Sequence, residues 1–358
     1  MTNQKPLRVG IVGCGNIAPP YVQTMRAYPQ LELAGIASRT YERCAAFADA
    51  HGLRAYPSVA ELLADDSIDL IIDLSYQDAH AAVVRQCLDA GKHVYSEKPL
   101  ALNHAEASAL ADLAAQKGLR LGSAPCTFMS ESAQTAWKVI REGRLGTIRV
   151  VYAELNHGRV DRWHPAPILF FESGPLFDVG PYPLTILTAL LGPAARVQAY
   201  GRILLAERQT QDGQRFTVKA PDFALVLIEF RSGAFVRLTA NYYVDWMKKQ
   251  SGIEFHGDDG SLFLANTMLY NAPVEFAEYG KPYGPVEFVH EPFRGIEWAR
   301  GIVDLADAIA TDRPHRATGR QAAHVIEIME SAYRSMESGS PVDLTSDFDP
   351  PSPMDWAL

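Results

Sequence analysis

The sequence predicts an α/β protein that begins with a doubly wound parallel sheet and continues into an α+β domain with an antiparallel or mixed sheet. Apolar runs of strand length alternate with helix-compatible stretches through the first third of the chain. A glycine-rich turn, Gly13-Cys14-Gly15, directly follows the first of these runs. After about Pro125 the alternation gives way to successive strands without intervening helices, which indicates a second type of sheet.

The elements of the first domain follow from the position of apolar runs and helix-stop glycines. Segments 7–12, 31–37, 69–74, 92–95 and 119–122 are predicted strands, and segments 16–27, 41–51, 58–64, 79–90 and 105–117 are predicted helices. In such a sheet, ligands bind at the carboxyl ends of the strands. We therefore expect the residues that directly follow strands to lie at this edge, namely Gly13, Ser38, Ser75 and Glu97.

The second domain contains longer strands and fewer helices. Segments 147–155, 197–205, 223–230, 234–241 and 253–256 are predicted strands, and segments 130–142, 175–191, 297–310 and 320–336 are predicted helices. Arg231-Ser232-Gly233 separates two of the strands and predicts a hairpin. The expected division is a first domain at 1–124, a second at 125–340 and a tail at 341–358, whose proline and aspartate content favours disorder.

Composition excludes several classes of partner. The chain has 358 residues and a net charge of −9, which argues against nucleic acid or an anionic membrane. Residues 1–7 are polar and do not resemble a signal peptide, and no apolar run is long enough to span a bilayer. The four cysteines are far apart, which predicts reduced thiols in a cytoplasmic protein (Cys14, Cys44, Cys87, Cys126).

The glycine-rich turn has the spacing of a dinucleotide-binding fingerprint. Gly13 permits a tight turn, Gly15 allows the backbone to approach a pyrophosphate, and Ala18 keeps helix and strand close. The phosphates would lie on the N–H groups at the start of the following helix, beside Asn16 and Ile17. The turn therefore predicts a nicotinamide dinucleotide as cofactor.

The end of the second strand bears on the choice of cofactor. An acidic residue there would bind the ribose of NAD, but the sequence has Ser38 and Arg39 instead. Arg39 is suited to a 2′-phosphate, which favours NADP over NAD. In the alternative, Ser38 only caps the next helix, Arg39 is solvated, and NAD is accepted. Ser75 and His80 are further candidates for contacts in the cofactor cleft.

Three motifs together resemble the glucose–fructose oxidoreductase/inositol dehydrogenase (Gfo/Idh/MocA) family. They are GCGNIA after the first strand, AGKHVYSEKPLA at 90–101 and SGPLFDVGPY at 173–182, and the resemblance extends from about residue 7 to 336. It implies a Rossmann domain, a C-terminal domain with a large open sheet, and NAD(P)-dependent chemistry on sugars or cyclitols. It also implies a catalytic Lys98 beside Glu97 and a substrate contact at Asp178. Tyr182 occupies the place of the family's proton-carrying histidine, as in the branch with glucose–fructose oxidoreductase and dimeric dihydrodiol dehydrogenase.

The chemistry of these side chains agrees with that interpretation. Oxidation of an alcohol needs a base within hydrogen-bond reach, and tyrosine, with a pKa near 10, is a poor base at neutral pH. A nearby ammonium such as Lys98 lowers that pKa. Asp178 precedes Tyr182 by four residues and shares a helix face with it if the helix continues, although Gly180 and the adjacent prolines disfavour continuity.

Each assignment has a simpler alternative. Lys98 is otherwise a turn residue, Asp178 an acid that stabilises a helix start, and Tyr182 a core aromatic. No compact spacing supports a metal site, so we expect none at the scattered candidates His157, Asp161 and His164. The loop that contains Arg162, Trp163 and His164 is either a substrate-binding loop or merely structural.

The sequence thus predicts an NAD(P)-dependent oxidoreductase acting on a sugar, polyol or related carbonyl. The alternatives are a trans-dihydrodiol or other non-sugar carbonyl reductase of the same branch, and a non-catalytic regulator that senses a dinucleotide or sugar. The resemblance also implies sheet-to-sheet packing between subunits, so we expect a symmetric homodimer or homotetramer, which a molar mass measured in solution would test.

Overall fold

The computed structural model describes residues 5–245 and 249–358, so residues 1–4 of the polar N-terminal stretch lie outside the described part. The chain forms two compact units, each assembled from segments distant in sequence. The first unit contains the residues up to Cys126 together with Glu297–Ile326, and the second contains Thr127–Ile296 and Glu327–Leu358.

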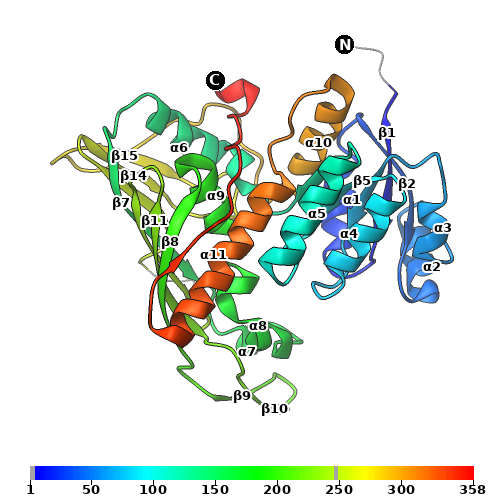
Figure 1. Ribbon diagram of the computed structural model, residues 1–358, viewed down its shortest axis with the longest axis horizontal. Helices are drawn as coiled ribbons and strands as arrows, with labels where there is room; N and C mark the ends of the chain where they lie inside the picture. The colour runs from blue at the N-terminus through cyan, green and yellow to red at the C-terminus, as the bar shows by residue number, and fades with distance from the viewer. Residues whose placement is uncertain (1–4, 246–248) are drawn as a thin grey trace. The chain divides into compact units, whose positions relative to one another are not determined.

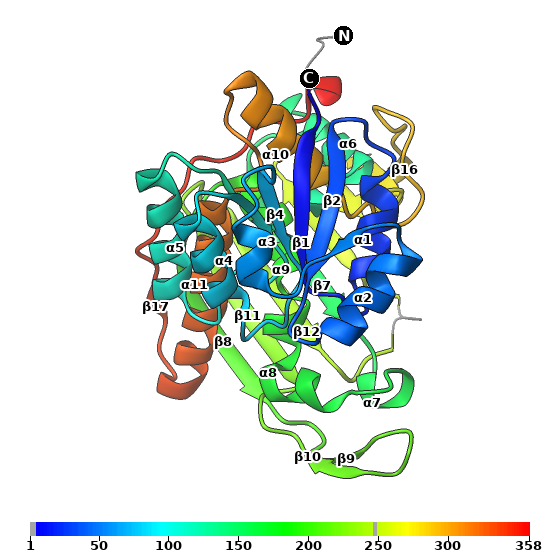
Figure 2. The ribbon, with the colours of Figure 1, turned by 90° about the vertical axis from the view of Figure 1, so that its right-hand side faces the viewer.

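The first unit is built on a six-stranded sheet in the order β3-β2-β1-β4-β5-β6, with all neighbouring strands parallel. Figure 2 shows α1 and α2 beside one face of this sheet and α4 and α5 beside the other. Because both faces are covered, β1 and β4 are apolar and mostly buried. The strands are β1 (Leu7–Val12), β2 (Leu31–Ala37), β3 (Arg54–Ala55), β4 (Leu70–Asp73), β5 (His93–Ser96) and β6 (Leu121–Ser123), and the helices are α1 (Ala18–Met25), α2 (Tyr41–Ala50), α3 (Val59–Leu63), α4 (His80–Asp89) and α5 (His104–Gln116).

This arrangement confirms the doubly wound parallel sheet that the sequence predicts. Every predicted element of this region is present, with ends displaced by at most two residues, and only the two-residue strand β3 is additional. Side-chain caps explain two of the helix starts. The Ser58 hydroxyl accepts the Glu61 N–H at the start of α3, and the Asn103 carbonyl oxygen accepts the Glu106 N–H at the start of α5.

Helix α10 (Arg300–Thr311) also belongs to the first unit, although the sequence analysis placed it in the second domain. It packs against β5 and β6, and Gly301 permits this approach, because an added Cβ would lie 2.4 Å from the Tyr95 hydroxyl oxygen. The chain then passes the edge strand β6, where the Ser123 N–H donates to the Ala317 carbonyl and Thr318 bridges Gly122. The expected boundary at 124/125 therefore omits a segment that completes the first unit.

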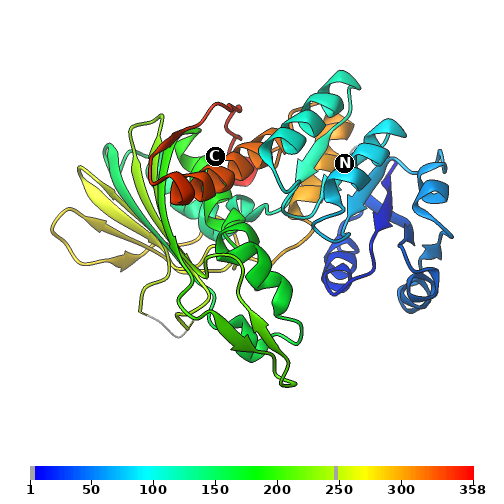
Figure 3. The same cartoon turned by 60° about the horizontal axis from the view of Figure 1, so that its bottom comes forward.

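The second unit is built on a nine-stranded sheet in the order β16-β15-β14-β13-β7-β12-β11-β8-β17. Strands β7 and β12 are parallel, and the other neighbours are antiparallel, so the sheet is mixed. Figures 1 and 3 show α8, α9 and α11 beside one face of it. Along β12, fully buried residues alternate with partly exposed ones, so one face of the sheet is packed and the other is partly open.

The elements of this unit include several that the sequence analysis missed. The predicted hairpin is confirmed, since β11 and β12 are antiparallel and Gly233 takes a positive φ of 89° between them. The short strands β9, β10 and β14–β17 were not predicted. The strands are β7 (Ile148–Asn156), β8 (Ala194–Arg202), β9 (Glu207–Gln209), β10 (Arg215–Thr217), β11 (Phe223–Phe230), β12 (Phe235–Asn241), β13 (Gly252–Gly257), β14 (Gly260–Leu264), β15 (Val274–Glu278), β16 (Gly284–Pro285) and β17 (Val342–Asp343). The helices are α6 (Glu131–Arg141), α7 (Val160–Trp163), α8 (Ile168–Asp178) and α9 (Pro181–Leu191), with short 3₁₀ helices at Thr127–Met129 and Asp355–Ala357. Helix α11 (Gly319–Ser338) begins in the first unit and belongs to the second from Glu327 onward.

The single helix predicted at 175–191 is wrong, because the chain is broken there into α8 and α9. A Cβ at Gly180 would lie 2.1 Å from the Leu176 carbonyl oxygen, so the backbone passes too close for any other residue in this conformation. Pro181 and Pro183 supply no N–H groups to continue the α8 ladder. Asp178 and Tyr182 therefore lie on either side of a helix break.

The expected disorder of the tail at 341–358 is also wrong. Strand β17 pairs with β8, and the side chain of Glu327 on α11 accepts hydrogen bonds from the backbone and hydroxyl groups of Thr345 and Ser346. These bonds attach the tail to its unit. Within the described ranges, none of the helices has the length and apolar content needed to cross a membrane.

The tail contact predicts a pH-dependent contribution to stability. Partial burial raises the pKa of Glu327, but hydrogen bonds from Ser346 and Thr345 outweigh this and lower it from 4.5 to about 2. The lowered pKa means that the stabilisation is complete above pH 4.5 and is lost as the pH falls toward 2. After allowance for solvent screening, we expect Glu327→Gln to reduce the free energy of unfolding at pH 7 by about 1–2 kcal/mol.

The measurement is urea unfolding of the parent and of Glu327→Gln between pH 7 and pH 3. The difference between them should shrink as the pH falls. A difference that is constant across this range would contradict the assignment of the stabilisation to the charged carboxylate.

Candidate functional site

The glycine-rich turn after β1 has a backbone that other residues cannot adopt. Gly13 has a φ of +104°, and an added Cβ would lie 2.4 Å from the Leu74 carbonyl oxygen at the end of β4. At Gly15, by contrast, an added Cβ would meet no described protein atom within 4 Å. Gly13 is therefore required by the fold, whereas Gly15 leaves space beside the backbone. Ala18, fully buried at the start of α1, has room for only a small side chain.

This turn fits a dinucleotide pyrophosphate. The second and third residues of α1 are Pro19 and Pro20, which carry no N–H, so the donors for a phosphate must come from the preceding residues Gly15, Asn16 and Ile17. Next to the turn, just after β4, Ser75 donates its N–H to the Asp73 carboxylate at 3.0 Å. A hydroxyl at this edge of the sheet is suited to a polar ligand group.

The end of β2 carries two exposed guanidinium groups. The Ser38 hydroxyl donates to the Thr40 carbonyl and accepts from the Cys14 thiol, and the cap residue of α2 is Thr40. The alternative in which Ser38 caps that helix is therefore wrong. Arg39 and Arg43 are exposed, and neither pairs with a carboxylate in the described part of the chain. Arg43, one helical turn after Arg39, was missed by the sequence analysis, although its i, i+4 spacing was visible.

The segment Glu97-Lys98-Pro99 follows β5 and is fixed by a buried carboxylate. Glu97 accepts hydrogen bonds from the Tyr21 hydroxyl at 2.6 Å and from the Lys98 N–H at 2.9 Å. Burial, together with the charge of Glu97, raises the pKa of Tyr21 well above its usual value, so the phenol remains a donor. Tyr21 had no distinguishing signal in the sequence. Glu97 thus joins the fingerprint helix α1 to the backbone of Lys98.

His80 holds the same segment from the other side. It is the first residue of α4 and is buried, with Nδ1 at 2.7 Å from the Pro99 carbonyl oxygen and Nε2 at 3.0 Å from the Ser75 carbonyl oxygen. Asp73 lies nearby, and burial raises its pKa while the charge of His80 opposes that increase. His80, which the sequence predicts as a cofactor contact, thus connects the loops that follow β4 and β5.

All the predicted cofactor-binding residues are therefore brought to one edge of the parallel sheet (Gly13, Gly15, Asn16, Ile17, Ala18, Ser38, Arg39, Ser75, His80, Glu97 and Lys98). The structure shows their protein contacts, and their contacts with a cofactor remain predictions. Lys98 belongs to this first unit, whereas Asp178 and Tyr182 belong to the second.

In the second unit, Asp178 is held by a tyrosine that the sequence analysis missed. Asp178 is the last residue of α8, and its carboxylate accepts a hydrogen bond of 2.7 Å from the hydroxyl of Tyr242, just after β12. Asp178 thus ends α8 and lies three residues before the start of α9. Tyr182 is the second residue of α9 and is 7% exposed.

The predicted substrate loop forms the short helix α7. Arg162 is exposed, and Trp163 is 38% exposed with its ring against those of His157 and His164. Asp161 is buried and paired with Arg208 at 2.7 Å, so its carboxylate is occupied by a guanidinium. Among the described residues no group of three potential ligands is placed to hold a metal ion.

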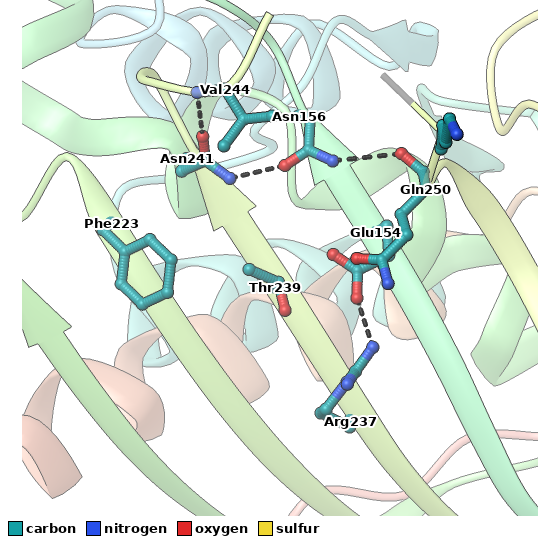
Figure 4. Close-up of a pocket in the computed structure, with 9 residues that line it drawn as sticks. Glu154, Asn156, Phe223, Arg237, Thr239, Asn241, Val244 and Gln250 are labelled. Atoms are coloured by element: carbon teal, nitrogen blue, oxygen red, sulfur yellow. Dashed lines mark hydrogen bonds and ion pairs between the residues drawn. The ribbon is translucent and has the colours of Figure 1, made fainter. Parts of the chain in front are cut away.

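A polar pocket of about 460 Å³ lies on the partly open face of the second sheet (Figure 4). Its polar groups are largely paired with one another. Asn241 donates to Asn156 at 2.6 Å, Asn156 donates to the Gln250 carbonyl, and Arg237 pairs with Glu154. These bonds link the carboxyl ends of the parallel pair β7 and β12 and fix the segment that leads to Tyr242. The lining residues are Glu154, Asn156, Phe223, Arg237, Thr239, Asn241, Val244, Lys249 and Gln250.

A doubly wound sheet with a dinucleotide fingerprint, and a lysine fixed at its carboxyl edge, defines the class of NAD(P)-binding oxidoreductases. Residues 7–124 match the description "Oxidoreductase family, NAD-binding Rossmann fold", and residues 133–263 match "GFO/IDH/MocA C-terminal domain". The two matches together cover more than half of the chain, and the chain belongs to the Gfo/Idh/MocA family of oxidoreductases.

The similarity to individual proteins covers part of each sequence. The chain is 32% identical over 199 residues to dTDP-3,4-didehydro-2,6-dideoxy-alpha-D-glucose 3-reductase of Streptomyces violaceoruber, covering 54% of this chain and 57% of that protein. It is 31% identical over 201 residues to trans-1,2-dihydrobenzene-1,2-diol dehydrogenase of Bos taurus, covering 55% and 60%. The match therefore spans less than two thirds of either relative. A solved NAD binding oxidoreductase from Klebsiella pneumoniae superimposes with a TM-score of 0.86 over 96% of this chain and all of that one, at 21% identity, which shows the fold.

Substitutions of the two glycines of the turn should have separable effects, on stability for Gly13 and on cofactor binding for Gly15. We expect Gly13→Ala to destabilise the fold, because of its positive φ and the close approach to Leu74, and Gly15→Ala to leave stability unchanged. If the space at Gly15 is used by a pyrophosphate, Gly15→Ala should weaken NAD(P)H binding about tenfold or more. Thermal unfolding and fluorescence titration with NADH and NADPH measure the two effects. Unchanged cofactor affinity in a folded Gly15→Ala variant would contradict the role of this turn.

Proposed function

We propose that this protein transfers a hydride between a nicotinamide cofactor and a sugar, a sugar-like polyol or the corresponding carbonyl compound. The observation that carries the proposal is Lys98, fixed by Glu97 at the edge of the dinucleotide-binding sheet. The Streptomyces violaceoruber relative, named as a sugar reductase, supports this substrate class.

In the proposed reaction the bound nicotinamide supplies or accepts the hydride, and side chains from the two units manage the proton and the substrate. Lys98 provides a positive charge that polarises the substrate oxygen and favours the phenolate form of Tyr182. Tyr182 exchanges the proton with the substrate hydroxyl. Asp178 accepts a hydrogen bond from another substrate hydroxyl, and Arg162, Trp163 and His164 contact the rest of the substrate. This assignment places the chain in the branch where tyrosine replaces the proton-carrying histidine.

A second candidate is a trans-dihydrodiol or other non-sugar carbonyl reductase. The relative from Bos taurus, which is named as a dehydrogenase of trans-1,2-dihydrobenzene-1,2-diol, favours it. The test is turnover of D-glucose, myo-inositol and 2,3-butanedione with both cofactors. Turnover of D-glucose or myo-inositol supports the first candidate, turnover of 2,3-butanedione supports the second, and turnover of none supports a regulator that only binds its ligands. We infer a cytoplasmic location, which is supported by the wide spacing of the four cysteines in the sequence. The homodimer or homotetramer expected from the sequence stays a prediction.

We also propose that NADP(H) is preferred to NAD(H). Arg39 is exposed beside Ser38 at the ribose position and has no competing carboxylate among the described residues. Arg39→Ala should therefore weaken NADPH binding by about 1.5–3 kcal/mol, or roughly tenfold to a hundredfold, and leave NADH binding unchanged. Arg85→Ala on the exposed surface of α4 is the matched control and should affect neither. Equal weakening of both cofactors by Arg39→Ala, or a parent protein that prefers NADH, would refute the assignment.

If Lys98 and Tyr182 transfer the proton together, substitutions of the two residues should have coupled effects on turnover. Lys98→Ala and Tyr182→Phe should each lower kcat by about 10²–10⁴-fold. The double variant should lose far less than the product, because groups that act as a unit are not additive. In the oxidation direction the parent rate should rise with pH around a midpoint below the pKa of free tyrosine, and Lys98→Ala should move this midpoint upward.

Steady-state kinetics with the best of the three substrates, together with cofactor titration, provide the measurement. Cofactor affinity should remain within a few-fold of the parent. Lys117→Ala, which removes a surface ammonium paired with Asp89, is the control and should leave kcat unchanged. Near-normal turnover in Tyr182→Phe would return Tyr182 to a packing role.

A further inference from the structure

We propose that Tyr242 is a positioning residue, whose phenol holds the carboxylate of Asp178 in the orientation that receives the substrate hydroxyl. The inference rests on the proposed function, in which Asp178 binds substrate. The Tyr242 hydroxyl lies 2.7 Å from Oδ2 of Asp178, and the Tyr242 side chain is completely buried. Oδ2 of Asp178 is therefore fixed by the protein, and this contact sets the orientation of the whole carboxylate.

The direction of this hydrogen bond is set by electrostatics. Burial and the adjacent negative charge of Asp178 raise the pKa of Tyr242 well above its usual value. The phenol therefore keeps its proton and donates it to the Asp178 carboxylate. A hydrogen bond donated to a charged acceptor is roughly twice as strong as one between neutral groups.

The helix break explains why a side chain performs this task. Asp178 precedes α9, and an acid near a helix start is usually stabilised by N–H groups of the first turn. In α9 the first and third residues are Pro181 and Pro183, which have no N–H, and the Tyr182 N–H already donates to the Val179 carbonyl at 3.2 Å. The first three residues of α9 thus leave no free backbone donor for the Asp178 carboxylate, and the Tyr242 phenol supplies one from the sheet.

Tyr242 is itself held at its backbone and at its ring. Its N–H donates to the Asp222 carbonyl at 2.9 Å, and its ring centroid lies 5.3 Å from that of Phe171. In the preceding residue, the side-chain oxygen of Asn241 accepts the N–H groups of Tyr243 and Val244 at 3.1 and 2.7 Å. The phenol is therefore fixed before a substrate binds, which lowers the entropy cost of ordering Asp178 during binding.

The contacts that hold Tyr242 also connect to α7, the predicted substrate loop. The side chain of Arg208 is fully buried between the carboxylates of Asp161 and Asp222, and it pairs with both. Asp161 directly precedes Arg162 and Trp163 on α7, whereas Asp222 carries the carbonyl that fixes Tyr242. One buried ion network thus sets the positions of α7 and, through Tyr242, of Asp178 within the second unit.

The test is the substitution Tyr242→Phe, which removes a single oxygen atom. With the better of D-glucose and myo-inositol as the probe, both of which carry hydroxyl groups, we expect KM to rise about 10–100-fold, with kcat and NADPH affinity within about threefold of the parent. The acidic limb of the pH profile of kcat/KM should move to higher pH, because a carboxylate that loses a donor is protonated more easily. A packing role alone would not move this limb.

Tyr333→Phe is the matched control. Its phenol is half-buried in the second unit and donates a hydrogen bond of 2.8 Å to the Ser173 carbonyl of α8. It should leave KM and the pH profile unchanged. In the Asp178→Asn background, Tyr242→Phe should add less than threefold to KM, because the charged acceptor is gone.

The outcomes separate this inference from the proposed function. If neither D-glucose nor myo-inositol turns over, or if Asp178→Asn leaves KM unchanged, the proposed function fails at Asp178. If Asp178→Asn raises KM but Tyr242→Phe does not, the positioning role is overturned. If Tyr242→Phe does not fold, folding of the double variant Tyr242→Phe/Asp178→Asn supports the role, since removal of the charge removes the need for the donor, and failure of both variants to fold overturns it.

Discussion

The buried carboxylate of Glu97 is the contact on which the geometry of the first unit depends. It accepts one hydrogen bond from the Tyr21 phenol on α1 and one from the Lys98 N–H. A buried carboxylate without such donors would be strongly destabilising, so the two bonds constrain helix and loop together. As a result, the helix that begins at the dinucleotide fingerprint and the lysine proposed for catalysis are parts of one rigid arrangement. His80 completes it by joining the loops after β4 and β5.

The second unit uses buried charge in a comparable way. Arg208, with no exposed side-chain surface, lies between Asp161 and Asp222, and its guanidinium stacks on Phe171 at 4.5 Å. Removing one partner of such a network leaves an uncompensated charge, which is why these networks fix a single arrangement. Here the fixed parts are α7, which carries Trp163, and the segment after β12, which carries Tyr242. Each unit therefore holds a preformed set of groups, which we propose to contact the cofactor in the first unit and the substrate in the second.

Local patterns predicted the elements that local interactions determine. The apolar runs of β1, β2 and β4 and the capped starts of α3 and α5 need only their own residues, and they were placed within two positions. Sequence patterns failed to predict elements whose structure is determined by contacts between distant residues. Strands β14 and β15 are short and become strands through pairing with β13 and with each other. The tail is ordered by Glu327, and the segment 297–326 belongs to the first unit because Gly301 fits against Tyr95, which no local window contains.

The residues of the candidate site likewise fall into those that local sequence patterns predicted and those that only the structure revealed. The sequence by itself determined the fingerprint turn, the absence of an acid at the ribose position, and Lys98, because glycine geometry, charge and position after a strand are local properties. It also pointed to Asp178 and Tyr182 through motif order, although it predicted one helix where Gly180 and two prolines impose two. Only the tertiary structure revealed Tyr21, Tyr242 and Arg208, because a buried phenol or guanidinium acquires its role from partners 76, 64 and 47 residues away. These partners come together only when the chain folds. Once they are buried away from water, each donor depends on its acceptor for a hydrogen bond.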